Sequence, residues 1–174
     1  MYKKRAQIWI ETVTYTLIGL AIIGAVMAVM VPRINEASDK AVIGQVIDSL
    51  NLINNQMSEV TLSVGAQREI AINVKKGEYV IDSVNEQIYY VLDGTSVLYS
   101  QPGEEIKNGD IIIKTEQGLI GSKYKITLKL NYPSLNITYH DRDEEKRLTN
   151  APTAYRLLIQ NKGTASKQIN LELI

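Results

Sequence analysis

Apolar residues dominate the first part of the chain, and apolar and polar residues alternate in the rest. An apolar run begins at Ile8, and the segment from Thr12 to Val31 contains no charged residue. A helix rises about 1.5 Å per residue, so these roughly 20 residues match the hydrocarbon core of a bilayer, about 30 Å thick. The pattern predicts a membrane-spanning helix over about 8–31.

The helical pattern resumes after Pro32, which predicts a bend or a short interruption at the membrane boundary. Over 33–62, apolar residues recur at the spacings of an amphipathic helix, with Asp39 and other polar residues between them. The apolar positions are Ile34, Ala41, Ile43, Val46, Ile47, Leu50, Ile53, Met57 and Val60. This stripe can pack under a domain of the same chain or against neighbouring helices, and we expect the first.

From Gln67 onward the period changes to two, which is typical of strands. We predict at most nine strands: Arg68–Val74, Tyr79–Ser83, Gln87–Leu92, Ser96–Tyr99, Asp110–Thr115, Tyr124–Tyr132, Leu135–Tyr139, Ala154–Asn161 and Lys167–Leu173. Turn residues separate them at Lys76-Gly77, Asp93-Gly94, Pro102-Gly103, Asn108-Gly109, Gly118, Gly121 and Lys162-Gly163. The most polar stretch, 141–147, is predicted to be an exposed loop. The fold class is α+β, with an antiparallel β-sandwich (Ig-like or pilin-like) over 65–174.

Composition excludes several classes of function. The 19 basic and 19 acidic residues cancel formally, so the basic surface of a nucleic-acid binder is missing and we predict no nucleic acid contact. Cysteine is absent, which excludes disulfides, thiolate metal sites and cysteine nucleophiles.

The remaining chemistry is sparse. His140 is the only histidine, so a catalytic triad or a metal site built from several histidines is not expected. The acidic segment 141–152 begins like an EF-hand calcium loop, but Lys146 and Pro152 stand where that loop needs glycine and glutamate. Only an irregular calcium site stays open there. We therefore expect no catalytic residues, no metal, no cofactor and no enzymatic activity.

Charges at the N-terminus set the expected topology. Lys3, Lys4 and Arg5 directly precede the apolar run, so the positive-inside bias places the N-terminus in the cytoplasm and the chain after Pro32 outside. Glu11 lies near the start of that run, where a carboxylate is costly unless something pairs with it. An ordinary signal anchor, or a conventional signal peptide, gains nothing from such a residue.

The run Lys3-Lys4-Arg5-Ala6-Gln7-Ile8-Trp9-Ile10-Glu11 resembles the class III signal peptide of archaeal type IV pilin-like proteins. In that family a basic leader ending in a small residue is cut before a Gln, and a Glu stands five residues into the mature chain. Ala6, Gln7 and Glu11 match this motif position by position. The resemblance implies that a prepilin peptidase removes the leader, residues 1–6, by cutting between Ala6 and Gln7 on the cytoplasmic side.

The resemblance also implies how the mature chain assembles. The helix over 7–64 stays attached and packs laterally with identical subunits into an extracellular filament, used for adhesion or surface attachment. The implied partners are a pilus assembly ATPase and a membrane platform protein. Before assembly, the precursor is located in the cell membrane. On physical grounds, Glu11 can neutralise the new α-amino group of a neighbouring chain and so set the axial register.

Two alternatives stay open for the function. The chain can be a non-polymerising, single-pass membrane-anchored extracellular binding domain, or a minor pseudopilin of a secretion or DNA-uptake system. Resemblance to archaellin, the archaeal motility filament subunit, is weaker, because the Gly-rich helix start of that family is not seen in Gln7–Thr16.

One modification site is predicted. Asn136-Ile137-Thr138 is the only Asn-x-Ser/Thr sequon in the chain, and the expected topology places it outside the cell. Asn136 is therefore a candidate N-glycosylation site.

Overall fold

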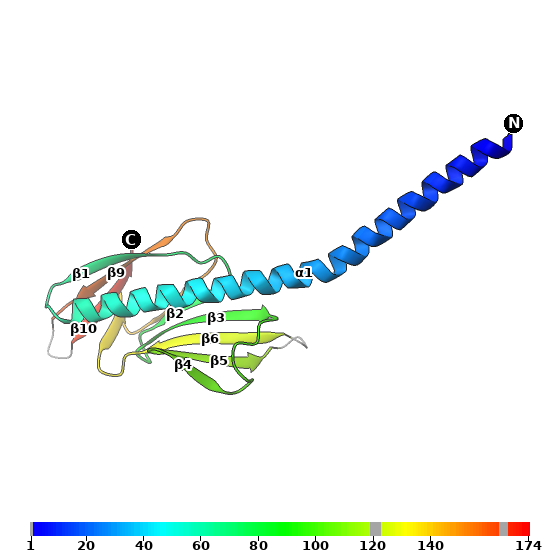
Figure 1. The fold of residues 1–174 in the computed structure, drawn as a ribbon. Helices are drawn as coiled ribbons and strands as arrows, with labels where there is room; N and C mark the ends of the chain where they lie inside the picture. The colour runs from blue at the N-terminus through cyan, green and yellow to red at the C-terminus, as the bar shows by residue number, and fades with distance from the viewer. Residues whose placement is uncertain (1, 119–122, 164–166) are drawn as a thin grey trace. The chain divides into compact units, whose positions relative to one another are not determined.

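The structure, a computed structural model, describes residues 2–118, 123–163 and 167–174, with side chains from Trp9 onward. One helix, α1 (Tyr2–Thr61), precedes the strands (Figure 1). The chain forms two compact units, which we call the helical unit (Met1–Ser38) and the β unit (Asp39–Ile174). Helix α1 therefore belongs to both units.

The β unit contains ten strands in its described residues. They are β1 (Gln67–Ile72), β2 (Glu78–Asp82), β3 (Gln87–Thr95), β4 (Glu105–Asn108), β5 (Ile111–Gln117), β6 (Tyr124–Asn131), β7 (Asn136–Tyr139), β8 (Glu145–Leu148), β9 (Tyr155–Asn161) and β10 (Gln168–Leu173). They form a four-stranded sheet of order β1-β9-β10-β7 and a six-stranded sheet of order β4-β5-β6-β3-β2-β8. The pairings are antiparallel apart from the parallel pair of β10 with β7. The predicted α+β class and two-sheet β domain are confirmed.

The strand predictions are wrong in three places. Ser96–Tyr99 is not a strand, because the hydroxyl of Thr95 accepts the backbone N–H of Val97 at 3.1 Å and turns the chain there. Strands β4 and β8 were not predicted, so the expected maximum of nine is exceeded. Strand β8 also lies partly inside the stretch 141–147, which was predicted to be a loop.

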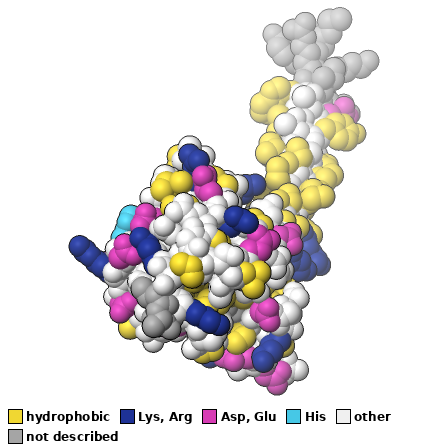
Figure 2. Space-filling view, turned by 90° about the vertical axis from the view of Figure 1, so that its left-hand side faces the viewer, with side chains coloured by type: hydrophobic (Ala, Val, Ile, Leu, Met, Phe, Trp, Pro, Cys, Tyr) yellow, Lys and Arg dark blue, Asp and Glu magenta, His cyan; other side chains and the backbone are white. Residues whose placement is uncertain are grey.

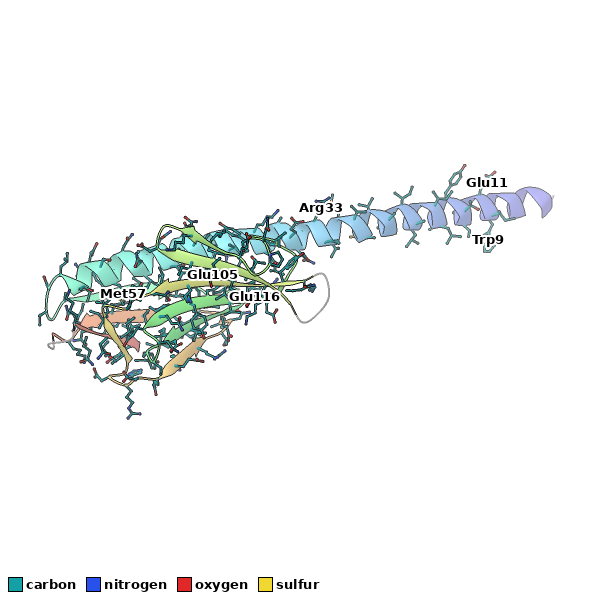
Figure 3. All side chains as sticks on the ribbon, turned by 90° about the horizontal axis from the view of Figure 1, so that it is seen from below. Trp9, Glu11, Arg33, Met57, Glu105 and Glu116 are labelled. Carbon is teal, nitrogen blue, oxygen red and sulfur yellow. The ribbon has the colours of Figure 1, made fainter. Side chains whose placement is uncertain are left out.

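Helix α1 continues without a break through Pro32, so the interruption considered there does not occur. Beyond Ser38 it becomes a core element of the β unit. Its buried side chains are Ile43, Val46, Leu50, Ile53, Met57 and Val60. They join one hydrophobic cluster with residues from both sheets, including Ile88 of β3 and Ile159 of β9. The expected packing of this stripe under the domain of its own chain is confirmed from Ile43 onward, whereas Ile34 and Ala41, which were predicted to belong to it, are exposed (Figures 1 and 3).

Hydrogen bonds also join this part of α1 to the rest of the β unit, at three positions along the helix. At its start, the Asp39 carboxylate accepts hydrogen bonds from Thr95 at 2.7 Å and from Lys76 at 2.5 Å. Further along, the Asn54 amide donates to Asp110 at 2.8 Å. At its end, the Asn161 amide donates to the carbonyl oxygen of Val60 at 2.9 Å, which satisfies one of the carbonyls that a helix C-terminus leaves unpaired.

The predicted turn glycines are largely confirmed. Positive φ angles occur at the predicted turn glycines Gly77, Gly103, Gly109 and Gly163. The turn predicted at Asp93-Gly94 is wrong, because β3 continues through it with a register shift between Leu92 and Thr95, where Gly94 has a positive φ. Gly118 has no positive φ, and Gly121 lies outside the described residues. Gly77 is also required for space, because a Cβ there would collide with the carbonyl oxygen of Val91 and the ring of Tyr90. The turn before β2 therefore admits only glycine without rearrangement.

Candidate functional site: the exposed apolar helix

Large apolar side chains lie exposed along the helical unit (Figure 2). Trp9 is 70% exposed and Tyr15 is 73% exposed. The others are Ile10, Val13, Leu17, Ile18, Leu20, Ile22, Ile23, Val26, Met27, Val29, Met30, Val31 and Ile34. Soluble proteins rarely leave a contiguous apolar surface of this kind uncovered, so it marks a place where lipid or another protein packs.

This helix is long and apolar enough to cross a membrane. Among the described residues, the segment Trp9–Thr61 is the one helix with the length and apolar composition of a membrane span. None of its most apolar stretch is buried within the chain. A spanning helix needs about 20 predominantly apolar residues, and the exposed stretch supplies them. The chain therefore carries one candidate membrane span near its N-terminus.

The hydroxyl groups in this stretch do not conflict with an apolar environment. Thr14 donates to the carbonyl oxygen of Ile10 at 2.8 Å, and Thr16 donates to that of Thr12 at 2.8 Å. Such bonds to the preceding helical turn satisfy the hydroxyl protons without water. Thr14 and Thr16 therefore add little cost to burying the helix in lipid or among other helices.

Two glycines in the helical unit are not explained by contacts within the chain. A Cβ built on Gly19 or Gly24 meets no described atom within 4 Å. Glycine inside a helix costs about 1 kcal/mol relative to alanine, so a position that offers room for a side chain needs another reason for glycine. Close approach of a second helix is such a reason, since small residues let neighbouring backbones pack tightly.

Most of the predicted N-terminal site residues are described by backbone alone. Lys3, Lys4, Arg5, Ala6 and Gln7 lie within α1, and their side chains fall outside the described residues. The leader and the predicted cut before Gln7 therefore stay predictions.

Glu11 is the predicted register residue whose side chain is described. It is exposed on the helix surface, and Figure 3 shows it on a different side of the helix from Trp9. Its proposed pairing with a second chain stays a prediction.

The predicted glycosylation site lies in an edge strand. Asn136 is half-buried and opens β7, which pairs on one side with β10. Thr138 of the same sequon is 4% exposed, and its hydroxyl donates to the side chain of Asn170 at 3.0 Å. The backbone N–H of Ile137 donates to the carboxylate of Glu86 at 2.5 Å, while burial raises the pKa of that carboxyl. The sequon is thus part of the packed β unit, which leaves its use as a modification site a prediction.

Two carboxylates of the acidic segment after His140 form ion pairs within the chain. Asp141 pairs with Lys162 at 3.2 Å, and Glu145 pairs with Arg147 at 2.6 Å. Within residues 2–118, 123–163 and 167–174 the structure contains no cluster of three or more metal-binding side chains. His140 follows β7 on the surface, with its ring centroid 4.5 Å from that of Tyr139. These carboxylates therefore face cations of their own chain.

One pocket lies in the β unit between α1 and the segment before β2. Its open volume is about 230 Å³, and it is lined by Val42, Gln45, Val46, Asn73, Lys75, Lys76, Tyr79 and Tyr90. Small-molecule sites usually enclose about 300–1,000 Å³ and are mostly apolar. The 230 Å³ of this pocket includes open solvent, so the space it encloses is much smaller, and lysine and amide groups line it. It therefore does not compete with the exposed helix as the functional surface.

The buried role of Asp39 was not predicted from the sequence, where its polar side chain placed it with the exposed face of the helix. Asp39 is 3% exposed and bonded to Thr95 and Lys76. Its spacing carries the signal, because residues 39, 43, 46 and 50 follow the alternating four and three residue steps of one helix face. A carboxylate on the core face of a helix predicts a buried partner.

Comparisons with known proteins found no similarity: no family model, curated protein or solved structure matches this chain.

Proposed function

We propose that this chain is a structural subunit of an extracellular type IV pilus-like filament, assembled by lateral packing of the exposed apolar helices. The observation that carries the proposal is the continuity of α1. From Trp9 to Ile34 most of its side chains are exposed and apolar, and from Ile43 to Val60 its apolar stripe lies in the core of the β unit. A simple anchor does not need its membrane helix to continue into the core of its domain, whereas a filament subunit that packs by this helix carries its domain on the same helix.

The resemblance of residues 3–11 to a class III signal peptide supports the same proposal. In this proposal a prepilin peptidase cuts between Ala6 and Gln7 on the cytoplasmic side. The precursor lies in the membrane with its N-terminus in the cytoplasm and its β unit outside. An assembly ATPase and a membrane platform protein then transfer it into a homopolymer used for adhesion.

The experiment examines the mature N-terminus and the surface filaments of cells that make this chain. Filaments are sheared from the cells, imaged by electron microscopy, and their main band is identified by peptide mass spectrometry. We expect this chain to be the main component and its N-terminal peptide to begin at Gln7. A chain that begins at Met1 or is cut near Ala28, and is missing from filaments, would instead indicate an ordinary anchor or a secreted domain.

A further inference from the structure

Charged residues are sparse in the helical unit. From Trp9 to Ser38 the sequence carries Glu11, Arg33 and Glu36 and no other charged side chain. Among the described residues, Glu11 and Arg33 are both exposed, and neither has an ion-pair partner. These two opposite charges bracket the uncharged, exposed part of the helix (Figure 3).

The spacing of this pair places both charges on one side of the helix. Glu11 and Arg33 are 33 − 11 = 22 residues apart. At about 1.5 Å and 100° per residue, the separation is about 33 Å along the axis and about six turns plus 40° around it. A second helix lying along this side would therefore meet both charges.

The same separation suits storage in a bilayer. The hydrocarbon core is about 30 Å thick, so the two charges reach opposite headgroup layers when the helix spans it. Both side chains can then reach hydrated headgroups, so the cost expected for Glu11 within the predicted span is small in the bilayer and arises when the helix leaves it. The charges lose this hydration when the helix leaves the lipid and packs among other helices.

Parallel helices at equal heights would place like charges together. Glu11 would lie beside Glu11 of the neighbour, and Arg33 beside Arg33, and both contacts are repulsive. A neighbour displaced along the axis by the length of this span places Glu11 beside Arg33 instead. Burying one charge without the other is strongly unfavourable, so such a pair discriminates against wrong displacements more than it adds net stability.

We propose that Glu11 of one subunit pairs with Arg33 of a second copy of this chain, displaced along the filament axis by about 33 Å. The pair rests on the filament function proposed above. Two features of the chain support a second copy as the occupant of this helix face. Glu11 and Arg33 carry opposite charges that meet at this displacement, and Gly19, about 80° around the helix from Glu11 at 100° per residue, leaves room for a close helix beside them.

A zero-length crosslink tests the pair directly. The variant R33K keeps the cation but offers a primary amine, which a carbodiimide joins to a touching carboxylate with loss of water. Sheared R33K filaments are treated with carbodiimide, and the linked peptides are identified by mass spectrometry. We expect an amide bond between positions 11 and 33 and a ladder of covalent multimers on a denaturing gel. Positions 11 and 33 of one chain lie too far apart to react, and the matched control E11Q/R33K removes the carboxylate.

Charge reversal gives a second readout. The variant E11R faces Arg33 with a like charge, and we expect filament yield to fall at least tenfold while the precursor still inserts in the membrane. The double variant E11R/R33E restores opposite charges, and we expect it to recover at least half of the native yield. A double variant as defective as E11R alone overturns the pair.

The failures of the pair and of the filament function are distinguishable. Filaments of R33K that link Glu11 to the α-amino group at Gln7, or to Lys40, and not to position 33 overturn the pair and leave the filament function standing. Cells whose native chain enters no filament overturn the filament function and the pair together.

Discussion

At the scale of single residues, the buried tyrosines give the β unit a predictable response to alkaline pH. Burial raises the pKa of Tyr79 to about 12 and raises the pKa values of Tyr90 and Tyr132 well above the ordinary value near 10. Above pH 10 the unfolded chain loses these protons while the folded chain keeps them. The unfolded state then binds fewer protons than the native state, so the free energy of unfolding falls as pH rises.

The variant Y132F tests this response. The hydroxyl of Tyr132 is buried without a hydrogen-bond partner among the described residues, so its removal should change stability at pH 7 by less than about 1 kcal/mol. At pH 11 the variant should be more stable than the native chain by about 1.4 kcal/mol, because one coupled deprotonation is gone. Urea unfolding of the detergent-solubilised chain at both pH values measures the difference. Parallel stability curves from pH 7 to 11 would contradict the proposed burial of this hydroxyl.

At the scale of elements, Asp39 adds a buried polar contact between α1 and the rest of the β unit. Replacing it by alanine removes two hydrogen bonds to a buried carboxylate and leaves the amine of Lys76 and the hydroxyl of Thr95 without that partner. We expect D39A to lower the free energy of unfolding by about 2–4 kcal/mol. Asp48 lies on the same helix and is exposed, so D48A is the matched control and should stay within about 0.5 kcal/mol of the native chain.

Urea unfolding in detergent, followed by far-UV circular dichroism, measures both variants. Equal stabilities of D39A and D48A would mean that the apolar stripe alone holds the helix. The variant D39N keeps an acceptor for Thr95 but loses the ion pair with Lys76, so it should fall between the two.

Helices and strands differed in how well the sequence predicted them. The apolar stripe from Ile43 to Val60 was found because burial on one side imposes the helical period directly. Strands β4 and β8 were missed because they are the two edges of the six-stranded sheet and carry charged residues in place of a clean alternation. Charged edge strands protect a sheet from pairing with other chains, and this same property hides them from a pattern of alternating hydrophobicity.

The candidate site was predictable only in part, for a related reason. The exposed apolar helix follows from composition, since a long uncharged run has few other uses. The proposed partner of Glu11 could not be predicted from the sequence, because it belongs to a second copy of the chain. In a single subunit such a contact shows only as a charge without a partner and a glycine without a packing reason. Asp39 is different, because its spacing places it on the buried face of the helix. It was nevertheless predicted to be exposed, because its side chain is charged.

At the scale of the whole molecule, the division into two units predicts that stability and assembly can be separated. The buried hydrophobic cluster begins at Ile43, and the deepest polar anchor of the helix is Asp39. A fragment of residues 36–174 keeps both and loses the exposed apolar helix. We expect it to be soluble without detergent and monomeric by light scattering. Its urea midpoint should match that of the β unit in the full chain.

The matched control is a fragment of residues 46–174, which lacks Asp39 and Ile43. Losing a buried isoleucine and a buried anchor should lower its free energy of unfolding by about 3–5 kcal/mol relative to the longer fragment. Neither fragment should enter filaments when mixed with native chains, because the surface proposed for assembly lies in the helical unit. Polymerisation of the fragment 36–174 would show that the assembly surface lies in the β unit. One that unfolds without detergent would mean that the apolar helix also stabilises the fold.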